Sequence, residues 1–179
     1  MRTAFLVAPE GVEQIELTSP WDALATTGET PQLLSTAPGS VQAFNHLDKG
    51  ATFPVDMTVD QVSADDFDLL VLPGGVANPD ALRLDRRAVD LVRGFFDAGK
   101  TVAAICHAPW TLIEADVVRG RTLTSWPSLR TDIGNAGGTW TDQKVVVCDN
   151  GPNTLITSRK PADLEAFNAR ILREVGAMT

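Results

Sequence analysis

Cysteine, long apolar runs and clustered basic residues are scarce in this 179-residue sequence. The two cysteines, Cys106 and Cys148, are too few for a disulfide framework and fit a reducing compartment such as the cytoplasm. No apolar run approaches the roughly 18 residues that a membrane-spanning helix needs. The amino-terminal apolar stretch is also too short for a secretory signal peptide. We therefore expect a cytoplasmic protein with no membrane partner.

Positive charge is in short supply as well. The chain has 15 Lys and Arg residues against 23 Asp and Glu residues, a formal net charge of −8 at pH 7. Without a basic cluster it is a poor candidate for binding polyanions, so we expect no nucleic-acid partner. The cysteines and histidines form no spaced ligand pairs, which argues against a metal site. No G-x-G-x-x-G loop follows the first apolar segment, so we expect no cofactor.

The sequence does contain a regular alternation of short apolar runs and longer segments of helical period. A length near 150 residues is typical of one domain, and we expect residues 1–179 to form one. Continuous apolar strands between amphipathic helices predict an α/β fold, with a mostly parallel sheet covered by helices on both faces. Strands are expected over 3–8, 32–36, 68–72, 101–105, 122–124, 144–148 and 155–158. Helices are expected over 13–27, 85–98, 128–136 and 162–175, with a further one starting at Pro109.

Two of these segments carry more specific expectations. Residues 37–58 are rich in Gly, Pro and Asp, and brief extended pieces at 41–44 and 52–55 predict a small hairpin excursion from the sheet. In the helix expected over 13–27, spacing predicts an inward apolar stripe. Its members are Ile15, Leu17, Trp21, Leu24 and Ala25.

The most informative segment ends the strand expected over 101–105. Cys106 follows this strand directly, and Pro109, a favoured first residue of a helix, comes three positions later. Strand, sharp turn and helix are the geometry of a nucleophile elbow, here with cysteine at the nucleophile position. A helix start offers free N–H groups and a positive dipole end, which favour a thiolate. Cys148 has no helix start after it, and we expect it to be an ordinary buried thiol.

Two other strand ends should lie beside Cys106 at the carboxyl edge of the sheet. Gly74 and Gly75 follow one strand, and adjacent glycines let backbone N–H groups approach a substrate oxygen as an oxyanion hole requires. Glu16 comes after the first strand, between apolar neighbours. A carboxyl group there should be partly desolvated, with a raised pKa, and could donate a proton or hydrogen bond to the sulfur.

These segments together resemble the PfpI family of the class I glutamine amidotransferase-like superfamily, whose members are described as intracellular proteases, protein deglycases or stress proteins. The resemblance covers essentially the whole chain. It is carried by residues 11–17 (GVEQIEL), 70–75 (LVLPGG), 104–109 (AICHAP) and 157–159 (TSR).

The resemblance implies a flavodoxin-like three-layer sandwich with Cys106 as nucleophile and Glu16 hydrogen-bonded to it. It also implies that the backbone N–H groups of Gly75 and His107 bind the oxyanion. If the chain is a protease, the resemblance implies that the His107 side chain is the catalytic base. Family members often form dimers, or hexamers built from dimers. In the protease mechanism of the family, a neighbouring subunit supplies a glutamate as a third acid. Asp80 occupies the position of that glutamate, and its side chain is one methylene shorter.

Two tryptophans depart from the family pattern. Trp110 stands where many members have glutamine, which should make the pocket wall bulkier and more apolar. Trp126 replaces a histidine that some relatives carry, which removes a second base.

Three functions remain open from the sequence. The favoured one is a cysteine-dependent stress-protection enzyme acting on reactive carbonyls, a deglycase or glyoxalase-type hydrolase of methylglyoxal adducts. Its substrates would be a small reactive carbonyl or a glycated protein or peptide. The alternatives are a PfpI-type intracellular cysteine peptidase and a non-catalytic redox sensor or chaperone-like stress protein. Glutamine amidotransfer is disfavoured because its His-x-Glu pair lies downstream of the cysteine, and no histidine follows His107.

Overall fold

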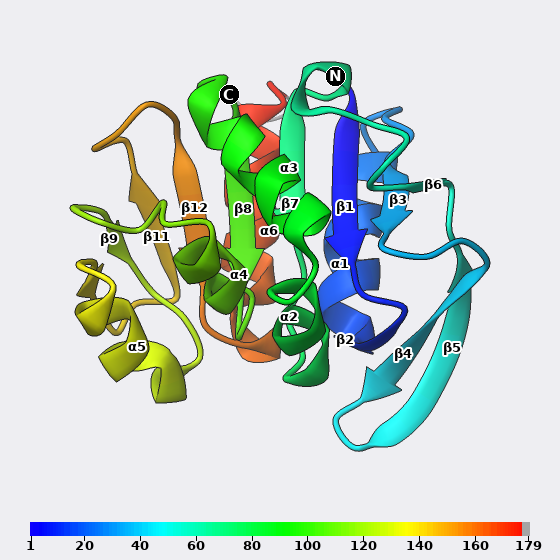
Figure 1. Ribbon diagram of the computed structural model, residues 1–179, viewed down its shortest axis with the longest axis horizontal. Coiled ribbons are helices and arrows are strands. Elements are labelled where there is room, and N and C mark those ends of the chain that lie inside the picture. Colours follow the sequence, from blue (N-terminus) through cyan, green and yellow to red (C-terminus); the bar gives the residue numbers. More distant parts are fainter. Residues whose placement is uncertain (177–179) are drawn as a thin grey trace.

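Seven strands form the central sheet of the computed structural model, which describes residues 1–176. Their order across the sheet is β11-β12-β8-β7-β1-β3-β6 (Figure 1). All neighbours run parallel except β11 and β12. The strands are β1 (Thr3–Val7), β3 (Gln32–Ser35), β6 (Met57–Thr58), β7 (Leu69–Leu72), β8 (Thr101–Ile105), β11 (Val145–Cys148) and β12 (Leu155–Ser158).

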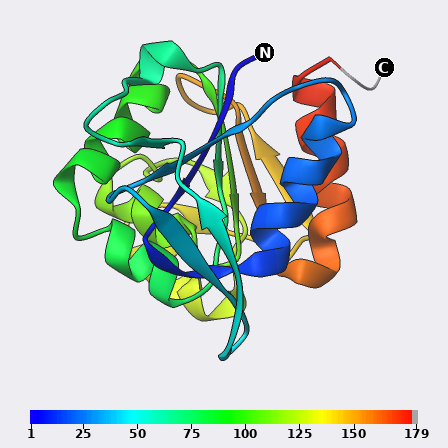
Figure 2. The ribbon, with the colours of Figure 1, turned by 90° about the vertical axis from the view of Figure 1, so that its right-hand side faces the viewer.

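Helices cover both faces of this sheet. In Figure 2, α1 (Gln14–Ala25) and α6 (Leu164–Glu174) lie side by side on one face, while α2 (Ala77–Leu82), α3 (Arg86–Asp97) and α4 (Pro109–Glu114) cover the other. Buried side chains accordingly form two apolar clusters, one on each face. Every residue of β1 and β7 is buried, as their unbroken apolar runs require. The expected α/β sandwich is confirmed.

The ends of α3 follow the sequence signals closely. The Asp85 side chain caps the helix by accepting from the Arg87 and Ala88 N–H groups. Gly99, just past the end, has φ +69°, which a residue with a side chain rarely adopts. By contrast, the short helix α2 was not expected from the sequence.

The apolar stripe expected on α1 is wrong at two positions. Ile15 is 44% exposed and Ala25 is also exposed, whereas Glu16 and Pro20 are buried. The helix is therefore rotated so that a carboxyl group faces the core. Helical periodicity predicts the buried face only where polar side chains point to solvent, and the Glu16 side chain points into the core instead.

The hairpin expected within 37–58 is present. Strands β4 (Ser40–Asn45) and β5 (Asp48–Pro54) pair antiparallel, and β4 also pairs with β2 (Glu10–Glu13), a strand the sequence did not predict. In Figure 1 this small sheet projects beyond the end toward which β1 and β8 point, close to α2. The carboxyl edge of the central sheet is thus walled by the hairpin on one side.

The remaining elements lie beyond β8 in the chain. Strands β9 (Thr122–Leu123) and β10 (Thr139–Trp140) form a separate parallel pair around α5 (Arg130–Asn135). Single 3-10 turns occupy Ala64–Asp66, Pro127–Leu129 and Pro161–Asp163. Within residues 1–176, no helix has the length and apolar character needed to cross a bilayer.

Candidate active site

The backbone turns sharply at Cys106, between β8 and α4. Its φ is +64°, a left-handed conformation that is costly for a residue with a side chain and that clusters at functional sites. The Cys106 N–H donates to Ser158 O at 3.0 Å, and its carbonyl accepts from the Trp126 N–H at 2.9 Å. Pro109 is the first residue of α4, as expected. The chain therefore fixes this strained turn from both sides.

The Glu16 carboxyl group is fully buried against Cys106. Its Oε2 atom accepts from the Gly74 N–H at 2.9 Å, while Oε1 has no partner among the described residues. The Glu16 pKa is raised to about 8, chiefly by burial and also by the negative charge of Glu13, and hydrogen bonds with Cys106, Gly74 and Gly75 keep it from rising higher. The raised pKa expected from the sequence agrees with this geometry, and Glu16 carries a proton at neutral pH.

Burial also raises the pKa of the Cys106 thiol, and an ionised Glu16 raises it further by repulsion. The Gly75 and His107 N–H groups donate to the sulfur and act in the opposite direction. Burial prevails, so the thiol pKa is raised overall, and the expectation that the elbow lowers it is corrected: α4 has only six residues, and its dipole does not offset desolvation. A proton on Glu16 removes the repulsion and lets the carboxyl group donate to the sulfur, so forming the thiolate costs less in that state.

The His107 ring lies beside the same sulfur. Its Nδ1 atom is 3.2 Å from Cys106 Sγ. The ring packs between Trp110 and Trp126, with centroid separations of 5.2 and 5.7 Å. Burial lowers the His107 pKa, which keeps the imidazole neutral and able to accept a proton.

The two glycines expected at the oxyanion position have different roles in the structure. The Gly74 N–H donates to Glu16 alone, whereas the Gly75 N–H is directed at both Glu16 and the Cys106 sulfur. Gly75 has φ +83°, and a Cβ there would collide with Gly11 O and lie 2.8 Å from Glu13 N. No other residue fits, because β2 crosses directly over this turn.

Asn78 is a site residue that the sequence analysis missed. It is fully buried, and its Oδ1 accepts from the Ala8 N–H at 2.7 Å. Its Nδ2 donates to Pro73 O at 3.0 Å and to Gly74 O at 3.1 Å. Asn78 thereby ties the end of β1 to the glycine turn that holds Glu16. In the sequence, Asn78 is only a polar residue three positions after the Gly-Gly pair. Nothing in that position predicts burial, which results from the placement of α2 against the end of β1.

A pocket of about 670 Å³ opens onto Cys106. Its walls come from β2, the tip of the hairpin, the turns at Gly75 and Cys106, Glu16 on α1, Trp126 and Pro161. The exposed apolar side chains of Leu47, Val76 and Trp126 surround its mouth.

Three of the expected site residues do not line this pocket within the protomer: Gly74, whose N–H is bound to Glu16, Trp110 and Asp80. Trp110 does not line it, and its indole N–H donates to Asp132 Oδ2 at 2.9 Å. The expectation that Trp110 forms the pocket wall is therefore corrected, since it packs behind His107 instead. Asp80 is exposed on α2 and also does not line the pocket.

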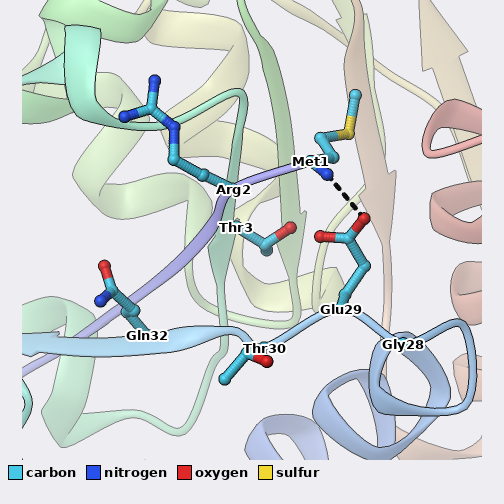
Figure 3. A pocket seen from close by; sticks show the side chains of 7 residues that line it. All are labelled: Met1, Arg2, Thr3, Gly28, Glu29, Thr30 and Gln32. Carbon is cyan, nitrogen blue, oxygen red and sulfur yellow. Dashed lines mark hydrogen bonds and ion pairs between the residues drawn. The ribbon is translucent and has the colours of Figure 1, made fainter.

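A second cavity, of about 310 Å³, lies at the opposite edge of the sheet (Figure 3). Figure 3 shows the ion pair between the Met1 ammonium group and Glu29 Oε1, at 2.8 Å, inside it. The described residues that line it include neither cysteine nor histidine. In addition, no cluster of three or more metal-ligating His, Cys, Asp or Glu side chains occurs within 1–176. The Cys106 pocket is therefore the candidate active site.

Comparison with known proteins shows which family this chain resembles. Residues 1–174 match the model of the DJ-1/PfpI family. A Pyrococcus horikoshii protein named as a deglycase is 42% identical over 93% of this chain and 95% of its own length. The Escherichia coli protein named protein/nucleic acid deglycase 2 is 41% identical over 98% of both chains. The crystal structure of Drosophila melanogaster DJ-1beta superposes with a TM-score of 0.85 at 30% identity, covering 98% of this chain and 90% of that one.

Proposed function

This chain belongs to the DJ-1/PfpI family, and we propose that it is a cysteine-dependent deglycase that removes methylglyoxal-type adducts from proteins and peptides. The relatives at about 40% identity over nearly the whole chain carry deglycase names. The observation that carries the proposal is the buried, protonated Glu16 beside Cys106, because this pair can both attack an aldehyde and move protons on the product. We further propose that the protein acts in the cytoplasm.

A hemithioacetal or aminocarbinol adduct first breaks its C–S or C–N bond, so that the protein leaves as its thiol or amine and methylglyoxal is set free in the pocket. The Cys106 thiolate then adds to the aldehyde carbon of methylglyoxal. The carbonyl π electrons move to oxygen, and the resulting oxyanion is held by the Gly75 and His107 N–H groups. Glu16 then gives its proton to this oxyanion, which forms a hemithioacetal. A carboxyl group with a pKa of about 8 suits this task, because it is charged enough of the time to take a proton back.

The second stage uses the Glu16 carboxylate so formed. It removes the proton from the former aldehyde carbon and returns it to the neighbouring carbon, while the hydroxyl proton moves from the former aldehyde oxygen to the former ketone oxygen. The aldehyde is thereby oxidised and the ketone reduced within one molecule, and the product is a lactoyl thioester on Cys106. Water hydrolyses this thioester to lactate and the Cys106 thiolate, and of the two protons released one returns to Glu16 and the other goes to solvent. Because oxidation and reduction cancel inside the substrate, these steps consume only water.

The PfpI-type peptidase is the second candidate, and one observation favours it. His107 Nδ1 lies 3.2 Å from Cys106 Sγ, within reach for a base. A peptidase base also needs a third group that orients it, and no described residue hydrogen-bonds the other His107 ring nitrogen. Asp80 of a neighbouring subunit, in a dimer or hexamer, would have to supply that contact. We therefore rank peptide hydrolysis below deglycation, and a redox-sensor role of Cys106 below both.

A product-resolved assay tests the proposed function. The purified chain is incubated with methylglyoxal, with a methylglyoxal-modified cysteine peptide and with casein. We expect lactate from the first two and no new peptides from casein. New casein fragments without lactate would favour the peptidase, and peroxide-dependent oxidation of Cys106 without any turnover would favour the sensor.

The pocket mouth also carries negative charge. Glu10 and Glu13 line it together with Glu16, and neither lysine nor arginine is among its described lining residues. Glu13 is fixed in place because its Oε2 accepts from the His46 N–H at 3.0 Å. Its charge reaches the reacting groups, since it raises the Glu16 pKa. We propose that adducts beside lysine or arginine are preferred and that glycated polyanions react slowly, in keeping with the absence of a nucleic-acid partner expected from the sequence.

Glu10→Gln tests this charge preference. The substrates are two hemithioacetal peptides with the same cysteine adduct, flanked by lysine in one and by glutamate in the other. We expect the variant to lower the lysine-to-glutamate ratio of kcat/KM by roughly two- to fivefold, as the loss of one exposed charge interaction allows. Added salt should lower the wild-type ratio in the same direction. Asp97→Asn, an equal charge change outside the pocket, is the control, and an equal effect from both variants contradicts the proposal.

A further inference from the structure

The guanidinium group of Arg121 is buried and has no carboxylate partner among residues 1–176. Arg121 lies just before β9 and is 2% exposed. Its hydrogen bonds to described residues go to neutral oxygens, namely Cys148 O at 2.7 Å, Asn153 O at 2.9 Å and Asn153 Oδ1 at 2.9 Å. Its Nε atom has no acceptor in the part of the chain that the structure describes, and the ring centroid of Phe96 lies 5.7 Å from the guanidinium carbon. Burying a cation without an anion costs desolvation free energy, so a negatively charged group is expected beside Arg121.

The neighbouring group that can supply this charge is the Cys148 thiol. The Thr122 N–H donates to Cys148 Sγ at 3.4 Å, and the Asn150 N–H donates to it as well. The Arg121 guanidinium donates to the Cys148 carbonyl at 2.7 Å and so brings its positive charge close to the sulfur. The nearby carboxylate, Asp149, is engaged by the Thr154 hydroxyl at 2.7 Å. Burial raises the pKa of Cys148, but these donors and the Arg121 charge outweigh burial and lower it overall. The sulfur is thus surrounded by donors, which suit an anion.

Cys148 is separate from the active site. It pairs with Leu155 on β12, and Leu155 pairs with Val102 near the beginning of β8, whereas Cys106 follows the end of β8. The two thiols therefore lie toward opposite edges of the sheet. Each cysteine is 6% exposed, and residues 149–152, which follow Cys148, are all exposed.

We propose that Cys148 and Arg121 form a thiolate–guanidinium pair, and that this pair is a second reactive-thiol site that takes peroxides and soft electrophiles independently of the Cys106 pocket. With hydrogen peroxide, Cys148 sulfur attacks one oxygen, the S–O bond forms and the O–O bond breaks. The sulfur loses two electrons to the peroxide, and the departing hydroxide takes the sulfenic proton to become water. The resulting sulfenate is still an anion, so it keeps its pairing with Arg121.

The first test uses the Cys106→Ser chain, in which Cys148 is the only thiol. Its alkylation by iodoacetamide is followed by mass spectrometry from pH 5.5 to 9.5, in the folded protein and in urea. We expect the midpoint of the rate profile to lie lower in the folded protein than in urea. Limited access to the sulfur lowers the alkylation rate at every pH, but it does not move the midpoint pH of the profile. A midpoint equal to or above that in urea, or no reaction when folded, overturns the proposal.

Arg121 is tested by two substitutions in the same chain. We expect Arg121→Met to raise the midpoint and Arg121→Lys, which keeps the positive charge, to restore part of the shift. An unchanged midpoint in a folded Arg121→Met chain refutes the pairing. If neither variant folds, the comparison of folded and urea-unfolded protein above decides the question. Cys148→Ser should also lose peroxide-dependent labelling by dimedone at this site while it keeps lactate formation, which separates this proposal from the proposed enzyme function.

Discussion

Replacing Cys106 by alanine is expected to lower kcat for methylglyoxal by at least about a thousandfold, as removal of a catalytic nucleophile does in other enzymes. The reason is that no other described group in the pocket can form the thioester from which lactate is released. Neutral His107 and protonated Glu16 remain in place but have nothing to act on. Lactate release measured by an enzymatic assay checks this expectation.

The fold should survive that change. Cys106 has φ +64°, and alanine tolerates this conformation at a cost of about 1–2 kcal/mol, similar to that of cysteine. Circular dichroism and urea unfolding verify that the variant is native. Cys148→Ser is the matched control, since it also removes one thiol and should leave turnover unchanged. Retained turnover in a folded Cys106→Ala chain would remove the nucleophile from the mechanism.

Glu16→Gln is expected to reduce kcat by roughly 10²- to 10⁴-fold, the range that general acid–base catalysis contributes. Glutamine has nearly the shape of a protonated glutamic acid and can still meet the Gly74 N–H, so the fold is kept. It cannot take the proton from the hemithioacetal carbon, which is the step assigned to Glu16. Stopped-flow measurement should therefore still show thiol addition, whereas lactate formation is lost. Equal loss of both steps would instead indicate a distorted site.

The same substitution changes how stability depends on pH. The Glu16 pKa is about 8 in the folded chain, against a reference value of 4.5. Between these values the native state holds a proton that the unfolded state has released, so the free energy of unfolding falls as the pH rises. The amide of Glu16→Gln does not titrate, so this part of the slope should disappear. Urea unfolding at pH 5, 6.5 and 8 measures it, and parallel slopes for the two chains would contradict a raised pKa. Carrying out the comparison in Cys106→Ala chains removes the titration of the neighbouring thiol.

The local sequence determined most of the framework. Unbroken apolar runs at β1, β7 and β8 predicted a buried parallel sheet. A strand with one face in solvent alternates apolar and polar residues, whereas a strand covered on both faces is apolar throughout. Asp85 and Gly99 marked the ends of α3, since capping depends on one side chain and one backbone conformation. The elbow at Cys106 could be read in the same way, from the order strand, cysteine, proline. The short elements β2 and α2 were missed because four to six residues carry too little periodic signal.

Which groups meet at the site was decided by the tertiary structure alone. Glu16 was singled out by its apolar neighbours, but its burial and its raised pKa follow from the rotation of α1 against β7. Asn78 and Arg121 had no distinguishing pattern, since their partners lie up to 70 positions away in the chain. Gly74 and Gly75 looked equivalent in the sequence, but the Gly74 N–H donates to Glu16 alone, whereas the Gly75 N–H is also directed at the Cys106 sulfur. Sequence patterns report what a residue does to its own helix, strand or turn. Desolvation and hydrogen bonding between distant segments depend on the packed arrangement, and these set the charge of Glu16, Cys106 and Cys148.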